Sequence, residues 1–368
     1  MGERRSALEG LVSMDWRGRR VLVTGHTGFK GSWLSLWLHA MGAEVSGLAL
    51  APPTDPSLFN AARIAELVDH EEGDIRDYAT VHATIARVKP EVVFHLAAQP
   101  LVRLSYEQPV ETYATNVMGT VHVMEAARRV GGVGALVCIT TDKCYENREW
   151  VWPYRETDPM GGYDPYSSSK GAAELAIAAY RRSYFPAEGG TLLASVRAGN
   201  VIGGGDWALD RLVPDLVRAF EAGEAPVIRS PNAVRPWQHV LEALGGYLLI
   251  AERLIAGEAA FADAWNFGPS DDDARPVSWI VDRMRATWGG THGATPHHGP
   301  VPHEAGLLRL DCSKARAALG WRPALTLDTA LDWIVDWHKQ AGAGADPRDL
   351  TLGQIAEYRA RMAAPVAG

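Results

Sequence analysis

The sequence predicts an α/β fold, with a doubly wound parallel sheet and a smaller, mostly helical lobe. Short apolar runs rich in β-formers alternate with segments of helical length, which is typical of βαβ units on a sheet buried on both faces. The chain has 368 residues, of which 47% are hydrophobic and 22% charged, enough for a large core. The expected strands are RRVLVTG, AEVSGLAL, EVVFHLAA, GALVCITT and TLLASVRAGNVI.

The order of these segments predicts four parts. Residues 1–17 are expected to be a mobile leader, and residues 18–200 to form the domain built on the sheet. Prolines and helical patterns then predominate, so residues 201–345 are expected to form the smaller lobe, interleaved with late strands and helices of the sheet. Residues 346–368 are expected to form a helical tail. Long helices are expected at about 108–130, 166–184 and, beyond the first domain, 238–255.

Composition excludes several classes of protein. The 36 basic and 44 acidic residues give a net charge of −8, which argues against a nucleic-acid partner. The three cysteines, Cys138, Cys144 and Cys312, form no paired motif, and no apolar run reaches the length of a membrane span. We expect a cytoplasmic protein with no membrane partner.

A glycine-rich turn between the first strand and an amphipathic helix predicts a dinucleotide site of the Rossmann type. Glycines at this spacing let the backbone turn tightly and approach a pyrophosphate at the helix N-terminus. The acid that usually binds the adenosine ribose is missing after the second strand, where the nearest carboxylate is Asp55, but no cation stands there for a 2′-phosphate. NAD is therefore the expected cofactor. Its expected ligands in this motif are Gly25, Thr27, Gly28, Phe29, Lys30 and Gly31.

Tyr166 and Lys170 lie one helical turn apart and form a candidate catalytic pair. A nearby ammonium favours the phenolate, so Tyr166 is expected to accept a proton from a substrate hydroxyl near neutral pH. Lys170 is also expected to reach the nicotinamide ribose. A surface pair on an amphipathic helix is the alternative explanation of this spacing.

Thr141, Asp142 and Lys143 directly follow the strand ALVCI. Ligands of open α/β sheets bind outside the carboxyl ends of the strands, so these side chains are expected in the same crevice as Tyr166. An acid beside a lysine would place two proton-transfer groups in one site. A solvated ion pair at a strand end is the alternative.

Together these motifs resemble the extended short-chain dehydrogenases/reductases, and within them the nucleotide-sugar 4,6-dehydratases, in particular those acting on CDP-glucose. The segments TGHTGFKGSWL, LAAQPLVRLSYEQPVETYATNVMGT, TTDKCYEN, DPYSSSK, RAGNVIGGGDW and RPWQHV carry the resemblance, which runs from about residue 20 to about residue 340. Lys143 stands where relatives acting on dTDP-glucose have Glu.

The resemblance implies further site residues and a mechanism. Lys143 would be the base at C5 and Asp142 the acid at the leaving hydroxyl, although one proton shared by the two is an equal alternative. The implied cofactor contacts are Asp74 and Ile75 at the adenine, Ala97, Ala98 and Gln99 at the diphosphate and ribose, and Asn116 at a helix kink. The implied nucleotide-sugar contacts are Asn200, Arg211, Arg235, Asn266 and His303.

The resemblance also implies a homodimer, or a dimer of dimers, built on the helices at 108–130 and 166–184. His292, His297, His298 and His303 lie in a Gly/Pro-rich stretch without defined ligand spacing, so no metal is expected. Three alternatives stay open: a nucleotide-sugar epimerase or reductase, a 4,6-dehydratase for dTDP- or GDP-sugars, and a non-catalytic nucleotide-binding protein.

Overall fold

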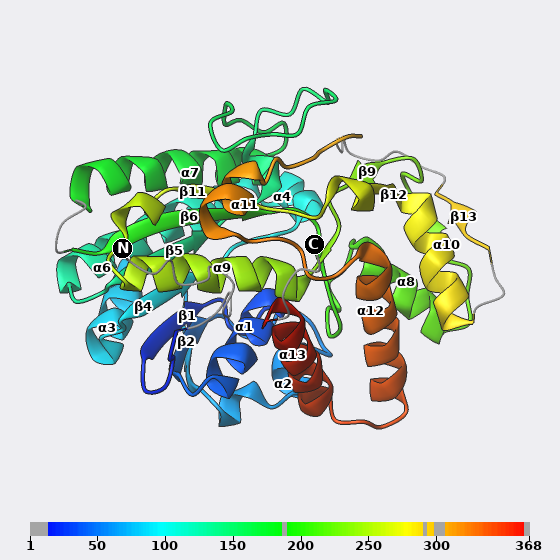
Figure 1. Ribbon diagram of the computed structural model, residues 1–368, viewed down its shortest axis with the longest axis horizontal. Helices are drawn as coiled ribbons and strands as arrows, with labels where there is room; N and C mark the ends of the chain where they lie inside the picture. The colour runs from blue at the N-terminus through cyan, green and yellow to red at the C-terminus, as the bar shows by residue number, and fades with distance from the viewer. Residues whose placement is uncertain (1–13, 186–189, 290–292, 298–305, 364–368) are drawn as a thin grey trace, which may run out of the picture.

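A parallel sheet of seven strands forms the centre of the part that the computed structural model describes, residues 14–185, 190–289, 293–297 and 306–363 (Figure 1). The strand order is β11-β6-β5-β4-β1-β2-β3, and the chain reverses its winding direction between β1 and β4. This confirms the predicted doubly wound α/β fold. The strands are β1 (Arg20–Thr24), β2 (Glu44–Ala49), β3 (Asp69–Glu72), β4 (Val92–His95), β5 (Ala135–Ile139), β6 (Leu192–Ala198) and β11 (Ala264–Phe267).

The expected strands correspond to β1, β2, β4, β5 and β6, while β3 was missed. Its sequence, DHEE, has no apolar residue, and most of it is exposed at the edge of the sheet. Only its parallel pairing with β2 makes it a strand. Hydrophobic periodicity cannot detect a strand that buries no apolar side chain.

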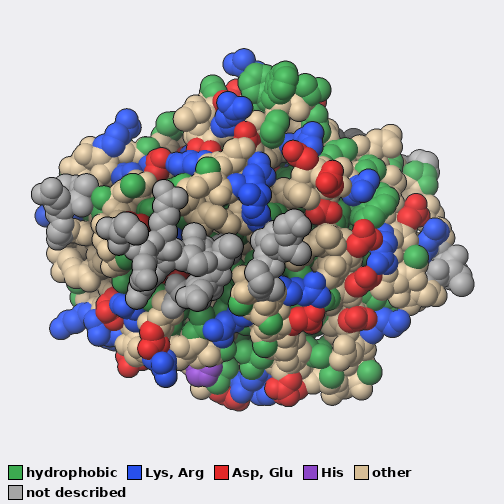
Figure 2. All heavy atoms as spheres, in the orientation of Figure 1, with side chains coloured by type: hydrophobic (Ala, Val, Ile, Leu, Met, Phe, Trp, Pro, Cys, Tyr) green, Lys and Arg blue, Asp and Glu red, His purple; other side chains and the backbone are tan. Residues whose placement is uncertain are grey.

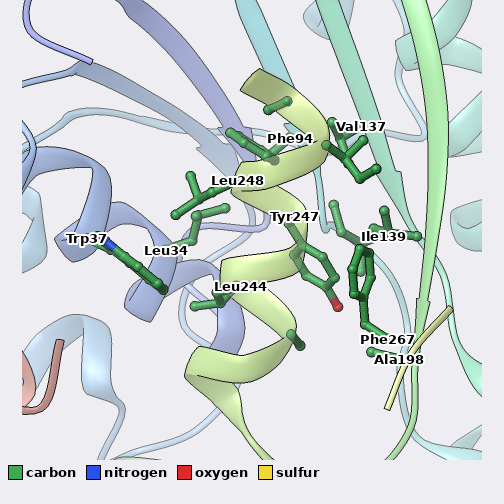
Figure 3. Packing of buried hydrophobic residues seen from close by; sticks show 14 of the residues in the cluster. Leu34, Trp37, Phe94, Val137, Ile139, Ala198, Leu244, Tyr247, Leu248 and Phe267 are labelled. Atoms are coloured by element: carbon green, nitrogen blue, oxygen red, sulfur yellow. The ribbon is translucent and has the colours of Figure 1, made fainter. Parts of the chain in front are cut away.

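Helices cover both faces of the sheet, and alternate residues of each strand serve the two cores. In β1, Val21 and Val23 pack into one core and Leu22 into the other. The Leu22 core is covered by α3 (Tyr78–Val88), α6 (Thr120–Val130) and α7 (Pro165–Tyr184). The opposite core is covered by α1 (Phe29–Ala40) and α9 (Val240–Ile255), and Figure 3 shows Tyr247 and Leu248 of α9 between α1 and the sheet.

The helix expected at 238–255 is α9, but it lies against the sheet rather than in the smaller lobe. Fourteen of its 16 residues are buried, as expected of a helix with neighbours on all sides. Its partners are β5, β6 and α1. The strand β11 from the same part of the chain extends the sheet beyond β6. The helix α9 and the strand β11 are thus late elements of the sheet domain, as the sequence analysis expected. The domain boundary at residue 200 stays a prediction.

The smaller lobe has its own core, formed by α8 (Leu212–Glu221), α10 (Val277–Trp288) and α12 (Leu327–Gly342). The tail helix α13 (Pro347–Ala363) packs on α1 and α12 and buries Tyr358. Short strands complete the lobe region: β7 (Val201–Ile202), β8 (Val227–Ile228), β9 (Val234–Arg235), β10 (Gln238–His239), β12 (Arg275–Pro276) and β13 (Thr295–Pro296).

Residues 1–13 of the predicted mobile leader lie outside the described residues, but its last residues are anchored. Trp16 is 1% exposed, and its indole N–H donates to Glu252 Oε1 at 3.0 Å. Its ring also packs near Phe94 of β4. Burial of an indole together with a satisfied N–H fixes this residue on the sheet domain.

The helix expected at 108–130 is continuous but changes its winding. It consists of α5 (Pro109–Tyr113), a π-helical segment η2 (Ala114–Gly119) and α6. Such π segments are frequent at functional sites. The remaining helical segments are α2 (Leu58–Ala61), η1 (Ile64–Glu66), α4 (Val102–Glu107), η3 (Asp142–Cys144), η4 (Ala259–Phe261), η5 (Asp271–Asp273) and α11 (Ser313–Leu319).

Candidate active site

The glycine-rich turn joins β1 to α1 and passes close to the end of β4. Gly25 has φ +78°, and a Cβ there would come within 2.7 Å of the backbone N of Ala97. A Cβ at Gly31 would come within 2.1 Å of the Gly25 carbonyl oxygen. Only glycine fits at these two positions, so they allow the tight turn and the close helix–strand packing.

The N-terminus of α1 suits an anionic group. Gly28 is its N-cap and supplies no side chain to the free N–H groups of the first turn, and no acidic side chain stands there. Free N–H groups and the positive end of the helix dipole favour a phosphate at this point. The residues present therefore fit the pyrophosphate of a dinucleotide.

The end of β2 lacks a charged partner for the adenosine ribose. Leu50 is exposed there, and its carbonyl accepts a hydrogen bond from the Thr27 hydroxyl at 2.8 Å. Beside it, His26 Nε2 lies 2.7 Å from His70 Nδ1, and burial, followed by the charge of His70, lowers the pKa of His26 to about 4. His26 is therefore neutral near pH 7 and offers no cation to a 2′-phosphate.

The other predicted cofactor residues lie at neighbouring strand ends. Asp74 and Ile75 follow β3, where both carboxylate oxygens of Asp74 bind Arg76. Asn116 lies in the π-helical segment: its Oδ1 accepts from Gln99 N at 2.9 Å and its Nδ2 donates to Ser169 Oγ at 2.9 Å. The predicted kink residue thus joins the end of β4, with Ala97, Ala98 and Gln99, to α7.

A cavity of about 280 Å³ opens beside the ends of β5 and β6 and reaches into the smaller lobe. It brings together Thr141, Asp142 and Lys143 from the end of β5 with Tyr166 of α7. Lys30, which the sequence analysis assigned to the cofactor, also lines it. Burial, followed by the charges of Lys170 and Arg211, lowers the pKa of Lys30 to about 7.

Tyr166 and Lys170 occupy the buried face of α7, which Asp164 and Pro165 begin as N-cap and first residue. In the chain by itself, the Tyr166 phenol holds its proton more tightly than the helical spacing indicated. Burial raises the pKa of Tyr166 to about 12, and its hydrogen bond with Thr141 only partly opposes this. Lys170 is a cation of reduced basicity, because burial lowers its pKa to about 8. Desolvation outweighs the attraction that helical spacing alone suggested.

Asp142 is 2% exposed, and its Oδ1 accepts a hydrogen bond from the Thr141 hydroxyl at 2.9 Å. Its Oδ2 is buried and has no hydrogen-bond partner among the described residues. Burial raises the pKa of Asp142, against the nearby charge of Lys143. A carboxyl group held toward its protonated form can donate a proton, and Lys143 lies beside it in the cavity wall.

Three of the five predicted nucleotide-sugar residues line this cavity: Asn200, Arg211 and Arg235. The prediction for Asn266 is wrong in this structure. Asn266 is fully buried in β11, and its side chain accepts from the Tyr145 hydroxyl and donates to the carbonyls of Tyr154 and Asp311. No polar atom of the side chain is left for a ligand, because a strand position between helices must satisfy its polar groups internally. His303 lies outside the described residues.

An ion-pair bridge that the sequence analysis did not predict lies at the solvent-exposed entrance of the cavity, its mouth. The carboxylate of Asp210 lies 2.7 Å from Arg103 of α4 and 3.1 Å from Arg229 after β8. The bridge therefore joins the sheet domain to the smaller lobe. Arg103 follows the Ala97–Gln99 motif by a few residues, which is the signal that could have found it. Asp210 and Arg229 come together only through the fold.

The cavity is cationic, although the whole chain is acidic. Six basic residues and four acidic residues line it, against a net charge of −8 for the protein. The basic residues are Lys30, Arg103, Lys143, Arg211, Arg229 and Arg235. On the face shown in Figure 2, by contrast, acidic and basic side chains are interspersed. A local excess of cations attracts an anionic ligand to this one place.

No group of three or more His, Cys, Asp or Glu side chains is placed to hold a metal ion in the described ranges. Within the same ranges no helix has the length and hydropathy needed to span a membrane.

The family of this chain follows from its similarity to known proteins. A sequence model of the GDP-mannose 4,6 dehydratase family matches residues 22–333, most of the chain. The chain belongs to this family. The chain is also 57% identical over 347 residues to the CDP-glucose 4,6-dehydratase of Salmonella typhimurium, covering 93% of this chain and 97% of that protein.

More distant relatives and solved structures carry other activities in their names. A dTDP-glucose 4,6-dehydratase of Xanthomonas campestris is 26% identical, covering 86% of this chain and 92% of that protein. The solved UDP-glucose 4-epimerase of Thermus thermophilus in complex with NAD has a TM-score of 0.75 and 26% identity, with 88% and 99% of the two chains covered. The dTDP-glucose 4,6-dehydratase of Streptomyces venezuelae also has a TM-score of 0.75, at 23% identity over 89% of this chain and 99% of that one, a likeness in fold.

Proposed function

We propose that the protein is an NAD-dependent 4,6-dehydratase that converts CDP-D-glucose to CDP-4-keto-6-deoxy-D-glucose and water. The observation that carries the proposal is the meeting of Tyr166, Asp142 and Lys143 in one cationic cavity. An epimerase needs proton transfer only at the hydroxyl on C4, whereas elimination also needs a base at C5 and an acid at O6. The 57% identical relative is a CDP-glucose 4,6-dehydratase, which supports the choice of base.

The proposed cofactor is NAD, held by the glycine-rich turn, Asp74, Ile75, the Ala97–Gln99 segment, Asn116 and Lys170. When bound, NAD would supply the redox chemistry, as acceptor of the C4 hydride and donor of the same hydride to C6, so that no net oxidation would occur.

The protein residues would move the protons. Tyr166 accepts the proton of the C4 hydroxyl, so its high pKa must fall in the complex, where the cationic cavity and Lys170 favour the phenolate. The 4-ketone makes the C5 hydrogen acidic, and Lys143 removes it. Asp142 donates its proton to O6, which leaves as water. A single proton passing from Lys143 to Asp142 fits the same geometry.

Two cations nearer the buried residues Asp142 and Tyr166 would bind the diphosphate. Arg235 is 4% exposed, and Arg211 lies beside Asp206 at 3.3 Å, so both are held in place before substrate arrives. Charge-assisted hydrogen bonds from guanidinium groups to phosphate are among the strongest that side chains make. Asn200, at the end of β6, is proposed as a neutral donor to the same nucleotide.

The proposed assembly is a homodimer through the helices α5, α6 and α7, or a dimer of dimers. Large hydrophobic side chains are exposed on this helical layer and would be covered by a second copy. They are Val110, Tyr113, Met118, Leu175 and Tyr184. Leu175→Glu is expected to convert the dimer to a monomer, measured as molar mass by light scattering. An unchanged mass would remove this surface from the assembly.

The proposed location is the cytoplasm. The three cysteines, all of them in described segments, are buried free thiols, which is usual in a reducing compartment.

The function is tested by incubating the protein with CDP-, dTDP-, GDP- and UDP-glucose, with and without added NAD, and measuring product mass. Loss of one water from CDP-glucose in preference to the others is expected. A product of unchanged mass but altered sugar would instead identify an epimerase, and loss of water from another sugar nucleotide alone would correct the base.

A further inference from the structure

A second carboxylate lies directly behind the cavity. Glu174 is on α7, one helical turn beyond Lys170, and is 3% exposed. Burial by itself would raise its pKa, but the charge of Arg197 and hydrogen bonds from three neighbours lower the pKa overall. Glu174 is thus an anion in the interior, which is costly unless its partners hold it.

These partners tie three elements together. Glu174 Oε1 accepts from the Thr140 hydroxyl at the end of β5, at 2.5 Å. Its Oε2 accepts from Ser195 and Arg197 of β6, both at 2.8 Å. Removing the carboxylate would leave Arg197 as an uncompensated buried charge.

The same pair holds both ends of the segment that carries Thr141, Asp142 and Lys143. Thr140, bound to Glu174, immediately precedes this segment. After η3, the Tyr145 hydroxyl accepts from Arg197 Nη1 at 2.8 Å and donates to Asn266 at 2.7 Å. Asn266, expected to bind substrate, is thus the outer end of this buried network.

We propose that Glu174 is a positioning residue, which with Arg197 fixes both ends of the Thr141–Lys143 segment and places a carboxylate one helical turn from Lys170. The inference rests on the proposed function, because it concerns the same proton transfers. Hydrogen bonds joined in one buried network hold their members more rigidly than the same bonds made separately, and here only Arg197 Nε has no partner among the described groups of the pair.

The carboxylate of Glu174 next to Lys170 predicts that removing Glu174 changes the pH dependence of kcat. Burial lowers the pKa of Lys170 to about 8, and Glu174 is the largest influence that raises it. Without Glu174 that pKa falls further, so Lys170 becomes neutral at lower pH and stops supporting the Tyr166 phenolate there. The ionisable groups around Lys170 and Glu174 are Lys30 of α1, His95 of β4, Cys138 of β5, Cys144 of η3, Arg181 of α7 and Arg197 of β6.

The test compares kcat for CDP-glucose between about pH 6 and about pH 10 in three variants. Glu174→Gln is expected to lower kcat at least about tenfold. It is also expected to shift the alkaline limb of the kcat–pH profile, where kcat falls as the pH rises, about one unit to lower pH. Glu174→Gln with Arg197→Met removes both buried charges, so it is expected to keep a Tm near that of the wild type while retaining the shifted limb. Glu174→Asp keeps the negative charge, but its shorter side chain does not reach Thr140. The alkaline limb of the kcat–pH profile is therefore expected to stay at the same pH, while kcat falls.

Glu242→Gln is the matched control. Glu242 of α9 is equally buried, and it binds the backbone N–H groups of Ala324 and Leu325 and the Tyr358 hydroxyl, away from the cavity residues. Its replacement is expected to leave the limb in place.

The inference is overturned if the limb does not move in either Glu174→Gln variant, if the double variant regains the kcat of the wild type, or if Glu174→Asp is fully active. A wild-type protein that turns over none of the nucleotide sugars would instead remove the proposed function. Normal turnover with unaffected variants would remove only the role of Glu174.

Discussion

The cavity has a buried part, its floor, and a solvent-exposed entrance, its mouth. Charged groups have different environments in the two parts. At the floor, Asp142 and Tyr166 are 2% and 8% exposed, and burial raises the pKa of both. At the mouth, the side chains of Arg103 and Asp210 are 39% and 41% exposed, and their ion pair is solvated. An exposed pair contributes only about 0 to 1 kcal/mol, whereas desolvation moves proton affinities strongly. The floor is therefore suited to proton transfer and the mouth to reversible binding of anions.

Tyr166→Phe is expected to have the largest effect at the floor. It removes the proposed proton acceptor for the C4 hydroxyl, so kcat should fall about 10²- to 10⁴-fold. The Kd of NAD should stay nearly the same, because only one hydroxyl is lost. Steady-state kinetics and a cofactor titration check both values. Near-normal turnover would exclude Tyr166 from the chemistry.

Lys143→Met separates oxidation from elimination. The variant keeps Tyr166 and Lys170, so it should still oxidise C4 and accumulate bound reduced nicotinamide, seen by its absorbance after CDP-glucose is added. The 6-deoxy product should form at least about 10²-fold more slowly. Lys314→Met, a replacement of a lysine paired with Asp263 outside the cavity lining, is the control. Product at the wild-type rate would show that another group removes the C5 proton.

At the mouth, smaller effects on KM are expected. Arg229→Gln removes a cation available to the diphosphate, so KM should rise about tenfold with kcat nearly unchanged. Asp210→Asn removes the carboxylate that pairs with Arg103 and Arg229. If these two cations attract the diphosphate, KM should fall about two- to fivefold at low salt. Asp328→Asn, in an exposed pair with Arg283, is the control. If Asp210→Asn raises KM, Asp210 helps to hold the substrate, and the contrast between floor and mouth is wrong on this point.

The preference for NAD over NADP is expected to be the mildest effect. Near β2 the neutral His26 and the uncharged Leu50 offer nothing to a 2′-phosphate, but they do not repel it either. Binding titrations should give a lower Kd for NAD by about tenfold or less. A tighter Kd for NADP would contradict the account of this strand end.

The contrast between floor and mouth also shows what the sequence could reveal. The floor residues lie in compact motifs, since Thr141, Asp142 and Lys143 are adjacent and Tyr166 and Lys170 share a helical turn. Such motifs, like the apolar strands β1 and β5, can be recognised from local spacing alone. The sequence therefore predicted the sheet and most of the floor.

What the sequence could not predict depends on distant segments or on burial. Arg103, Asp210 and Arg229 meet only when the two lobes fold together, and Asn266 lies in a motif yet faces the interior. Spacing suggested an acidic Tyr166, but the pKa responds to desolvation that spacing does not report. The strand β3 was missed because pairing, and not hydrophobicity, holds it in the sheet.

In the proposed reaction, C4 is oxidised, water is eliminated across C5 and C6, and the C4 hydride is returned to C6, all within one cavity. CDP-glucose labelled with deuterium at C4 tests it directly, when the wild-type protein is allowed to turn over in ordinary water and the product is analysed by NMR. The deuterium is expected at C6 of the 4-keto-6-deoxy product, and unlabelled CDP-glucose turned over in heavy water is expected to gain deuterium at C5. Loss of the deuterium to solvent, or its retention at C4 of an unchanged or epimerised sugar, would contradict the account.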